Sequence, residues 1–209
     1  MKGVQKIPTG IEGFDRMLSG GVPVGHILSL VGVIGTGKTI FSIQFVLEGL
    51  KRGENCIYIT LEEEVVSILK SAGTFGFDLK RYIDNKQLHL IKLDPADIKA
   101  TIKRVESELS GFITSIGAKR IVIDSVSVLA MLFPTPAERR RRIFELCNII
   151  KETGATALLI TEAKNNFQFQ SREGYVEYIA DGVINLQFME TDVSGKVGLA
   201  IRVVKMRHI

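Results

Sequence analysis

One short segment, GVIGTGKT (residues 32–39), constrains this chain more than any other. It follows the apolar run HILSLVG (26–32) and precedes a stretch whose apolar residues recur at helical spacing up to Gly53. Glycine is unfavourable inside either element, so its repeated use between them indicates a turn in which the backbone approaches another group closely. A strand, a glycine-rich turn and a helix in this order are the context of a phosphate-binding loop.

The group that the loop approaches is therefore predicted to be phosphate. Successive backbone N–H groups of such a loop point inward and, with the positive end of the following helix, form a cradle for the α- and β-phosphates. Lys38 is expected to reach the β- and γ-phosphates and the Thr39 hydroxyl to bind Mg²⁺, so the expected ligands are ATP or ADP with Mg²⁺. A side chain larger than hydrogen at Gly35 or Gly37 would obstruct the approach. The cradle is assigned to Val33, Ile34, Gly35, Thr36, Gly37, Lys38, Thr39 and Ile40.

Apolar runs rich in β-forming residues recur along the chain, with helix-like stretches between them. Strands of near-continuous apolar sequence are buried on both faces, and helical crossovers between them make their sheet parallel. The sequence thus predicts one α/β domain over residues 1–209, with a mostly parallel central sheet flanked by helices. The predicted strands are HILSLVG (26–32), CIYITL (56–61), QLHLIKL (87–93), RIVIDSV (120–126) and ATALLIT (155–161).

Two segments of the C-terminal half have clear local signals. Thr135 immediately precedes a helical stretch, and Glu138 is three residues after Thr135. This spacing is that of a capping box. The segments VINLQFME (183–190) and GLAIRVVKM (198–206) alternate polar with apolar residues, and turn residues including Gly195 join them. They predict an antiparallel hairpin at the edge of the sheet.

Hydrolysis of a triphosphate also needs a carboxylate near Mg²⁺ and a base that orients water. Asp124 ends the apolar run RIVID and is expected to emerge beside the loop as a Walker-B aspartate; the alternative is an aspartate that caps a turn. Glu62 and Glu63 follow a strand expected to neighbour the loop's own strand, at the sheet edge where ligands bind in α/β folds. Alternatively, the acidic run only begins the next helix, where the macrodipole favours it.

Composition excludes several classes of protein. With 45% hydrophobic and 24% charged residues and no apolar stretch near the 20 or so residues of a membrane span, we expect a protein without a membrane partner. The N-terminus has no apolar signal region, which favours a cytoplasmic location. Cys56 and Cys147 stand in apolar surroundings and are expected to be buried thiols. A net charge of +4 gives nucleic acid little support as a partner.

The motifs together resemble the KaiC-type ATPases of the RecA/RadA/DnaB superfamily. The resemblance extends from IPTGIEGFDRMLSGGVPVGHILSLVGVIGTGKT through YITLEE, RIVIDSVSVL, KETGATALLITEA and YIADGVINL to RVVKMRH. It implies a RecA-like P-loop NTPase core. This chain contains one copy of that domain, whereas the clock protein of the family is similar to two such domains in tandem. It also implies a homo-oligomeric, hexameric ring with nucleotide bound between subunits.

The resemblance also implies roles for individual residues. Glu62 matches the family's water-activating glutamate, with Glu63 in support, and Asp124 matches the Walker-B aspartate. Thr161 and Glu162 fall where RecA-like members keep residues that sense the γ-phosphate. RecA itself has an amide in place of Glu162, and this difference favours the KaiC branch over strand-exchange enzymes.

The C-terminal segment is expected to act on a neighbouring subunit. By strand parity Leu199, Ile201, Val203, Lys205 and Arg207 share one face, so an apolar face becomes cationic at its far end. The resemblance implies that Lys205 and Arg207 reach the nucleotide of the next subunit, where cations can stabilise charge in the transition state. The alternative is a strand that simply runs into solvent at Lys205.

Two further groups of residues allow more than one reading. Arg139 to Arg142 spread around a helix at about 100° per residue, so they are expected to be a solvated helix start with one or two interface salt bridges rather than a DNA-lining stripe. Phe167 and Phe169 lie in a predicted polar loop and are expected to pack against a neighbouring subunit; the alternative is stacking on bases in a central pore.

The sequence therefore predicts a Mg²⁺-dependent ATP-binding protein and slow ATPase, in which nucleotide state sets the binding of an unknown partner protein. A DNA-dependent ATPase of recombination and an autophosphorylating kinase are the alternatives.

Overall fold

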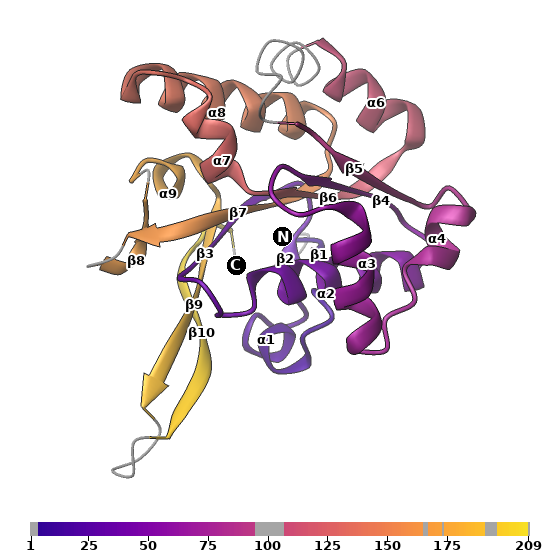
Figure 1. Cartoon of the computed structure of the whole chain (residues 1–209), viewed down its shortest axis with the longest axis horizontal. Helices are drawn as coiled ribbons and strands as arrows, with labels where there is room; N and C mark the ends of the chain where they lie inside the picture. The colour runs from indigo at the N-terminus through magenta and orange to yellow at the C-terminus, as the bar shows by residue number, and fades with distance from the viewer. Residues whose placement is uncertain (1–3, 95–106, 165–166, 173, 191–195, 209) are drawn as a thin grey trace.

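The computed structural model of the chain describes residues 4–94, 107–164, 167–172, 174–190 and 196–208, without the side chains of 167–170. Helices and strands alternate through most of the chain (Figure 1). In chain order they are β1 (Lys6–Ile7), α1 (Glu12–Met17), β2 (Val22–Pro23), β3 (Ile27–Gly32), α2 (Lys38–Lys51), β4 (Asn55–Thr60), α3 (Val65–Thr74), α4 (Lys80–Asp84), β5 (Leu88–Lys92), α6 (Leu109–Ile116), β6 (Ala118–Asp124), α7 (Val126–Met131), α8 (Pro136–Glu152), β7 (Thr156–Lys164), β8 (Phe167–Ser171), α9 (Val176–Ile179), β9 (Gly182–Glu190) and β10 (Val197–Met206).

A central sheet lies between two layers of helices, because its strands are apolar on both faces (Figure 1). In β3, Leu28 and Leu30 pack on one face with α1, α2 and α3, whereas Ile27 packs on the other face with α6, α7 and α8. The same alternation holds in β6, where Val122 belongs to the first cluster and Ile121 to the second. The predicted α/β architecture is confirmed.

The sheet has the strand order β10-β9-β3-β7-β6-β4-β5, and β8 pairs with β7 outside this path. All pairings from β9 to β5 are parallel, and only β10 and β8 are antiparallel. The expectation that the strand before Glu62 neighbours β3 directly is wrong. Strand β7 separates β6 from β3, and β4 lies one strand farther out, because the crossover through α2 passes over two strand positions.

The C-terminal hairpin of β9 and β10 forms one edge of the sheet, as predicted, and its far end projects from the body of the molecule (Figure 1). The predicted turn around Gly195 lies outside the described residues. Strand parity fails near the end of β10, because a bulge at Val204 places Val203 opposite Ile184 and Lys205 opposite Val183. Since neighbouring residues of β9 face opposite sides, Lys205 does not share the face of Val203.

Helix α8 begins with the predicted capping box. The Thr135 hydroxyl accepts from the Glu138 N–H, and a Glu138 carboxylate oxygen accepts from the Thr135 N–H. In the arginine run, Arg141 and Arg142 pair with Glu145 of the same helix. These intrahelical pairs, in which Arg141 is exposed and Arg142 and Glu145 are half-buried, agree with a largely solvated helix start.

A buried cation ties the N-terminal segment to the sheet. The side chain of Arg120 in β6 is fully buried and pairs with Glu54 at 2.6 Å. Its Nη1 also donates to the carbonyl oxygens of Pro8 (2.7 Å) and Phe45 (2.9 Å). Since a buried guanidinium is costly unless its N–H groups are satisfied, this network fixes residues before α1 against α2 and β6.

Strand β8 lies where the sequence predicts a polar loop. Residues 167–171, expected in a polar loop, form strand β8, which pairs with β7. The side chains of Phe167 and Phe169 lie outside the described part of the chain. Within the part that is described, no helix has the length and apolar character to cross a membrane.

Candidate functional site

The glycine-rich loop follows β3, whose last residue is Gly32. A Cβ atom on Gly32 would lie 2.5 Å from Thr36 Oγ1 and 2.9 Å from the Leu186 carbonyl oxygen, so only glycine fits. Gly35 and Gly37 have φ angles of +84° and +83°, in the left-handed region that favours glycine. The loop therefore depends on glycine for its backbone conformation as well as for close approach.

Helix α2 begins at the end of this loop with its N-terminal amides uncapped by any described side chain. Its N-cap is Gly37, and the first turn contains no acidic residue. Inside the loop, the Thr36 hydroxyl donates to the Val33 carbonyl oxygen at 2.8 Å, which tightens the turn. A helix N-terminus without a side-chain cap keeps donors and a positive dipole end for an anion. The uncapped start of α2 agrees with the predicted cradle, which stays a prediction.

Lys38 lies among carboxylates. Its Nζ donates to the carbonyl oxygens of Gly32 (2.9 Å) and Val33 (3.0 Å). Burial lowers the pKa of Lys38, whereas the negative charges of Glu162, Asp124 and Glu62 raise it, and burial prevails. The charges of Glu162, Asp124 and Glu62 all act on Lys38, so this end of the sheet carries more acidic than basic side chains near the loop.

Asp124 ends β6 and is only 7% exposed. Its Oδ2 accepts from the Tyr58 hydroxyl at 2.8 Å. Burial raises its pKa from 3.8 to about 6, and the charges of Glu62 and Glu63 raise it too, whereas the Tyr58 hydrogen bond and Lys38 lower it. Burial therefore disfavours the ionised form of Asp124, and a cation nearby would stabilise that form.

The acidic pair lies at the end of β4, beside Asp124. The Leu61 N–H donates to the Asp124 carbonyl oxygen at 2.7 Å, which joins the ends of β4 and β6. A Glu62 carboxylate oxygen accepts a hydrogen bond from the Ser125 hydroxyl. Glu63 instead turns toward α3, where its carboxylate accepts from Ser67 at 2.9 Å. Of the two glutamates, Glu62 is the one held toward the site.

Strand β7 brings Thr161 and Glu162 to the same sheet edge, where Glu162 is opposite Gly32. The Thr161 side chain is fully buried and contacts Ser29 Oγ at 3.3 Å. The Glu162 N–H donates to Ser127 Oγ at 3.1 Å, and its carboxylate pairs with Arg172 at 3.4 Å. Glu162 is therefore the member of this pair whose charge acts on the site.

The donors available for a metal suit Mg²⁺. No cluster of three or more histidine, cysteine or acidic residues able to hold a metal occurs in the described ranges. Mg²⁺ prefers oxygen ligands and is commonly held by one or two protein groups together with phosphates and water. Thr39, in the first turn of α2, and Asp124 supply a hydroxyl and a carboxylate of this kind. The residues present fit a magnesium–nucleotide site.

Lys205 and Arg207 lie at the amino-terminal ends of β3 and β9, whereas the loop lies at the carboxyl-terminal end of β3. Met206 is opposite Gly182, which in turn is opposite Leu28 near the start of β3, whereas the loop begins at the end of β3. The four residues from Leu28 to Gly32, at about 3.3 Å each, place the end of β10 roughly 13 Å from the start of the loop along β3. The structure thus does not bring these two cations to the loop of their own chain.

Both cations have partners where they lie. Lys205 Nζ donates to the carbonyl oxygens of Glu177 (2.9 Å) and Ala180 (2.6 Å) at the end of α9. Arg207 Nη1 lies 3.4 Å from Asp181 Oδ1, and Lys151 contacts the same oxygen at 2.9 Å. The expected continuation of the apolar face into both cations is therefore wrong for Lys205, and of the two cations only Arg207 pairs with the Asp181 carboxylate.

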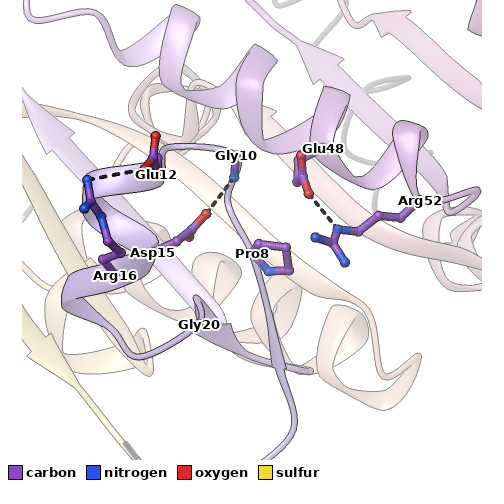
Figure 2. Close-up of a pocket in the computed structure, with 8 residues that line it drawn as sticks. All are labelled: Pro8, Gly10, Glu12, Asp15, Arg16, Gly20, Glu48 and Arg52. Carbon is purple, nitrogen blue, oxygen red and sulfur yellow. Dashed lines mark hydrogen bonds and ion pairs between the residues drawn. The ribbon is translucent and has the colours of Figure 1, made fainter.

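A separate cavity of about 400 Å³ lies between the N-terminal segment and the last turns of α2 (Figure 2). Its charged side chains are paired with one another, Arg16 with Glu12 and Arg52 with Glu48. The Asp15 carboxylate in the same cavity accepts from backbone N–H groups of the N-terminal segment. The polar groups of this cavity are occupied locally, which distinguishes it from the loop.

A sequence model of the KaiC ATPase family matches residues 7–209. The chain belongs to the KaiC-type ATPase family. The chain is similar to the circadian clock oscillator protein KaiC of Parasynechococcus marenigrum. The two are 35% identical over 192 residues, which cover 88% of this chain and 37% of that protein. The same clock protein of Prochlorococcus marinus subsp. pastoris is 36% identical over 192 residues, 88% of this chain and 38% of that protein. The chain thus spans less than two fifths of the length of these curated relatives.

A solved structure has the same fold. The crystal structure of a KaiC-like protein from the hyperthermophilic archaeon Pyrococcus horikoshii superimposes with a TM-score of 0.84 at 31% identity. The match covers 98% of this chain and 89% of that one. The predicted RecA-like core of a KaiC-type domain is confirmed.

The residues of the candidate site that sequence reasoning missed are mostly neutral polar groups that hydrogen-bond to the charged ones. Tyr58 stands inside an apolar strand, and only its hydroxyl in an otherwise buried run could have drawn attention to it. Ser42 and Ser127 lie within helices, where serine has no distinctive signal. Lys92, whose Nζ donates to the Glu62 carbonyl oxygen at 2.8 Å, comes from the end of β5, at the far edge of the sheet.

Proposed function

We propose that this protein binds ATP with Mg²⁺ at the loop 32–39 and hydrolyses it slowly. The observation that carries the proposal is an uncapped helix N-terminus whose first residue, Lys38, is under the electrostatic influence of Glu162, Asp124 and Glu62. Anion donors and cation ligands that face one another are what a magnesium–triphosphate needs. Membership of the KaiC-type family supports the same activity.

In the proposed complex, the backbone amides from Val33 to Ile40 hold the α- and β-phosphates, and Lys38 turns from its carbonyl partners to the β- and γ-phosphates. Thr39 and Asp124 would hold Mg²⁺, which offsets phosphate charge when it is bound. Each group thus has a separate task in binding.

Glu62 is the proposed general base. A water oxygen attacks the γ-phosphorus, the bond from phosphorus to the bridging oxygen of ADP breaks, and the water proton passes to the Glu62 carboxylate. The Ser125 hydroxyl, which donates to Glu62, keeps that carboxylate oriented. Glu63 is given a supporting role, because its own carboxylate is bonded to Ser67.

The remaining charge is proposed to be met by another subunit. Lys205 and Arg207 lie away from the loop of their own chain, which supports a role on the nucleotide of a neighbouring subunit. Repetition of this contact gives a homo-oligomer, which we propose to be a hexameric ring. The cations would exchange their present partners, Asp181 and the end of α9, for phosphate oxygens.

The base assignment is tested by comparing equilibrium binding with turnover. We expect Glu62→Gln to bind Mg²⁺–ATP as tightly as the natural chain and to lose turnover by a factor of 10² or more. The matched control is Glu64→Gln, an exposed glutamate two residues on that pairs with Lys92. Equal turnover in Glu62→Gln and the control would refute the role of Glu62. Retained tight binding in Lys38→Ala would refute the site itself.

The assembly is tested by light scattering with and without ATP. Arg207→Ala is expected to keep the assembled size and nucleotide binding while turnover falls, because the lost cation acts on transition-state charge. Unchanged turnover in an assembled Arg207→Ala protein would remove the trans role.

We propose a regulatory role, in which nucleotide state controls a partner protein, and a cytoplasmic location. The net charge of +4 supports this over a nucleic-acid motor. Stimulation of hydrolysis by single-stranded DNA, with steep salt dependence of binding, would favour the motor instead. A mass increase of one phosphate after incubation with ATP would indicate autophosphorylation.

A further inference from the structure

A tyrosine hydroxyl lies directly beneath the proposed metal ligands. Tyr58, in the middle of β4, is almost fully buried, and its hydroxyl donates to Asp124 Oδ2 at 2.8 Å. The same hydroxyl lies 3.0 Å from Ser42 Oγ on α2. Ser42 Oγ in turn donates to the Thr39 carbonyl oxygen at 2.7 Å. A continuous polar path therefore joins the two residues assigned to Mg²⁺.

Counting protons fixes the direction of this path. An ionised Asp124 only accepts, so the one proton of Tyr58 goes to it. Ser42 has one proton, so its bond to the Thr39 carbonyl oxygen at 2.7 Å and its donation to the Tyr58 oxygen at 3.0 Å compete in a three-centre arrangement. Donation from Ser42 to Tyr58 strengthens the donation from Tyr58 to Asp124, because hydrogen bonds in a chain polarise one another at low dielectric. The path thus runs from α2 toward the carboxylate.

We propose that Tyr58 is a positioning residue that sets the Asp124 carboxylate relative to the first turn of α2, and so makes the pair of Thr39 and Asp124 able to hold Mg²⁺. The inference rests on the proposed function, because it assumes that this pair holds the metal. It adds a residue that touches neither nucleotide nor metal.

The need for such a residue follows from the topology. Thr39 belongs to the helix after β3, whereas Asp124 ends β6, and β7 separates these two strands. Mg²⁺ requires nearly ideal octahedral geometry, with ligands at about 2.0–2.1 Å, so small displacements between the two elements weaken binding. Groups that hydrogen-bond to a metal ligand commonly change metal affinity by about 10–100-fold. Tyr58 is placed to join the two elements because β4 lies next to β6 and packs under α2.

The competing explanation is a structural tyrosine whose hydroxyl is merely satisfied. The two explanations differ in what removal of the hydroxyl changes. A structural tyrosine affects stability, and any effect on nucleotide binding is the same with and without metal. A positioning tyrosine affects the part of nucleotide binding that depends on Mg²⁺.

The test uses Tyr58→Phe, which removes the hydroxyl and keeps the ring. The matched control is Tyr82→Phe, because Tyr82 is also a buried tyrosine with a hydrogen-bonded hydroxyl but belongs to α4. Equilibrium binding of a fluorescent ADP is measured while Mg²⁺ is titrated, and again in EDTA. We expect Tyr58→Phe to need roughly tenfold more Mg²⁺ for half-maximal enhancement of binding, with unchanged affinity in EDTA. Tyr82→Phe should change neither quantity.

A second variant keeps the inference testable should Tyr58→Phe fold poorly. Ser42→Ala removes the link to α2 and leaves the Tyr58–Asp124 contact in place, so a two- to threefold rise in the Mg²⁺ requirement is expected. In the double variant the two effects should combine to less than their product, because both changes break one path.

The outcomes separate this inference from the function on which it rests. If the natural chain binds nucleotide identically with Mg²⁺ and in EDTA, the proposed magnesium site fails. If the natural chain depends on Mg²⁺ but Tyr58→Phe or Ser42→Ala titrates identically to it, only the positioning role fails. A loss of thermal stability in Tyr58→Phe with an unshifted Mg²⁺ titration likewise overturns the inference in favour of a structural tyrosine.

Discussion

Replacement of Asp124 by asparagine should make the nucleotide-free protein more stable while it removes Mg²⁺-dependent binding. Asp124 is buried at the end of β6, and its pKa in the folded chain is raised from 3.8 to about 6. An acid with a raised folded pKa stabilises the fold fully at pH values below about 4, and this contribution is lost as pH rises through about 6. At neutral pH the natural chain therefore carries the cost of a buried charge.

The size of that cost follows from the shift. A rise from 3.8 to about 6 corresponds to about 3 kcal/mol of unfolding free energy. Asparagine carries no charge, and its side-chain oxygen can still accept from Tyr58. The difference in unfolding free energy between Asp124→Asn and the natural chain should therefore increase by up to about 3 kcal/mol in favour of the variant between pH 4 and pH 8.

Urea denaturation of both proteins across this pH range measures the difference. Asp84→Asn, at an exposed position in α4, is the control for the change of residue type. Addition of Mg²⁺ to an ADP-containing sample should raise the unfolding midpoint of the natural chain beyond the effect of ADP alone, and this increment should be absent in Asp124→Asn, because the cation no longer has its carboxylate. A difference that does not vary with pH, or that favours the natural chain at pH 8, would refute the reasoning.

Three further predictions concern stability and binding. Arg120→Met should lower the unfolding free energy by about 3–5 kcal/mol in urea titrations, because Glu54 is left as an unpaired charge; a second change, Glu54→Gln, should recover part of this loss. Gly37→Ala should cost about 1–2 kcal/mol at φ +83° and abolish nucleotide binding measured by calorimetry. Thr135→Ala should cost about 1 kcal/mol and lower the thermal midpoint, because the capping box with Glu138 is lost.

The layers of the fold could be predicted from local patterns, but the order of its strands could not. Apolar runs and helical spacing are properties of neighbouring residues, so the strands from 26–32 to 155–161 were predicted nearly at their observed bounds. Which strand pairs with which depends on the crossovers, and a helix can pass over one strand position or several. Placing the strand before Glu62 beside β3 was wrong for this reason.

The charged part of the site was predictable because its residues follow strands that end at one edge of a parallel sheet. Glu62 and Asp124 meet there, and the Leu61–Asp124 backbone contact joins their strands. The neutral part was not predictable. Tyr58 and Ser42 contact each other only through the tertiary fold. The bulge at Val204 has no clear sequence signal either, so parity placed Lys205 on the wrong face.

Lys38 lies beyond one end of β3 and Arg207 lies near the other end, and this separation has a genetic consequence. If each site combines the loop of one copy with the tail of the next, two inactive variants carry complementary defects. An Arg207→Ala copy keeps its loop, and a Lys38→Ala copy keeps its tail. Equal mixing after dissociation should restore activity to about a quarter of the sites, since contacts of head-to-tail type form in every combination. Cells that produce both defective proteins would then recover part of a function that neither supplies alone.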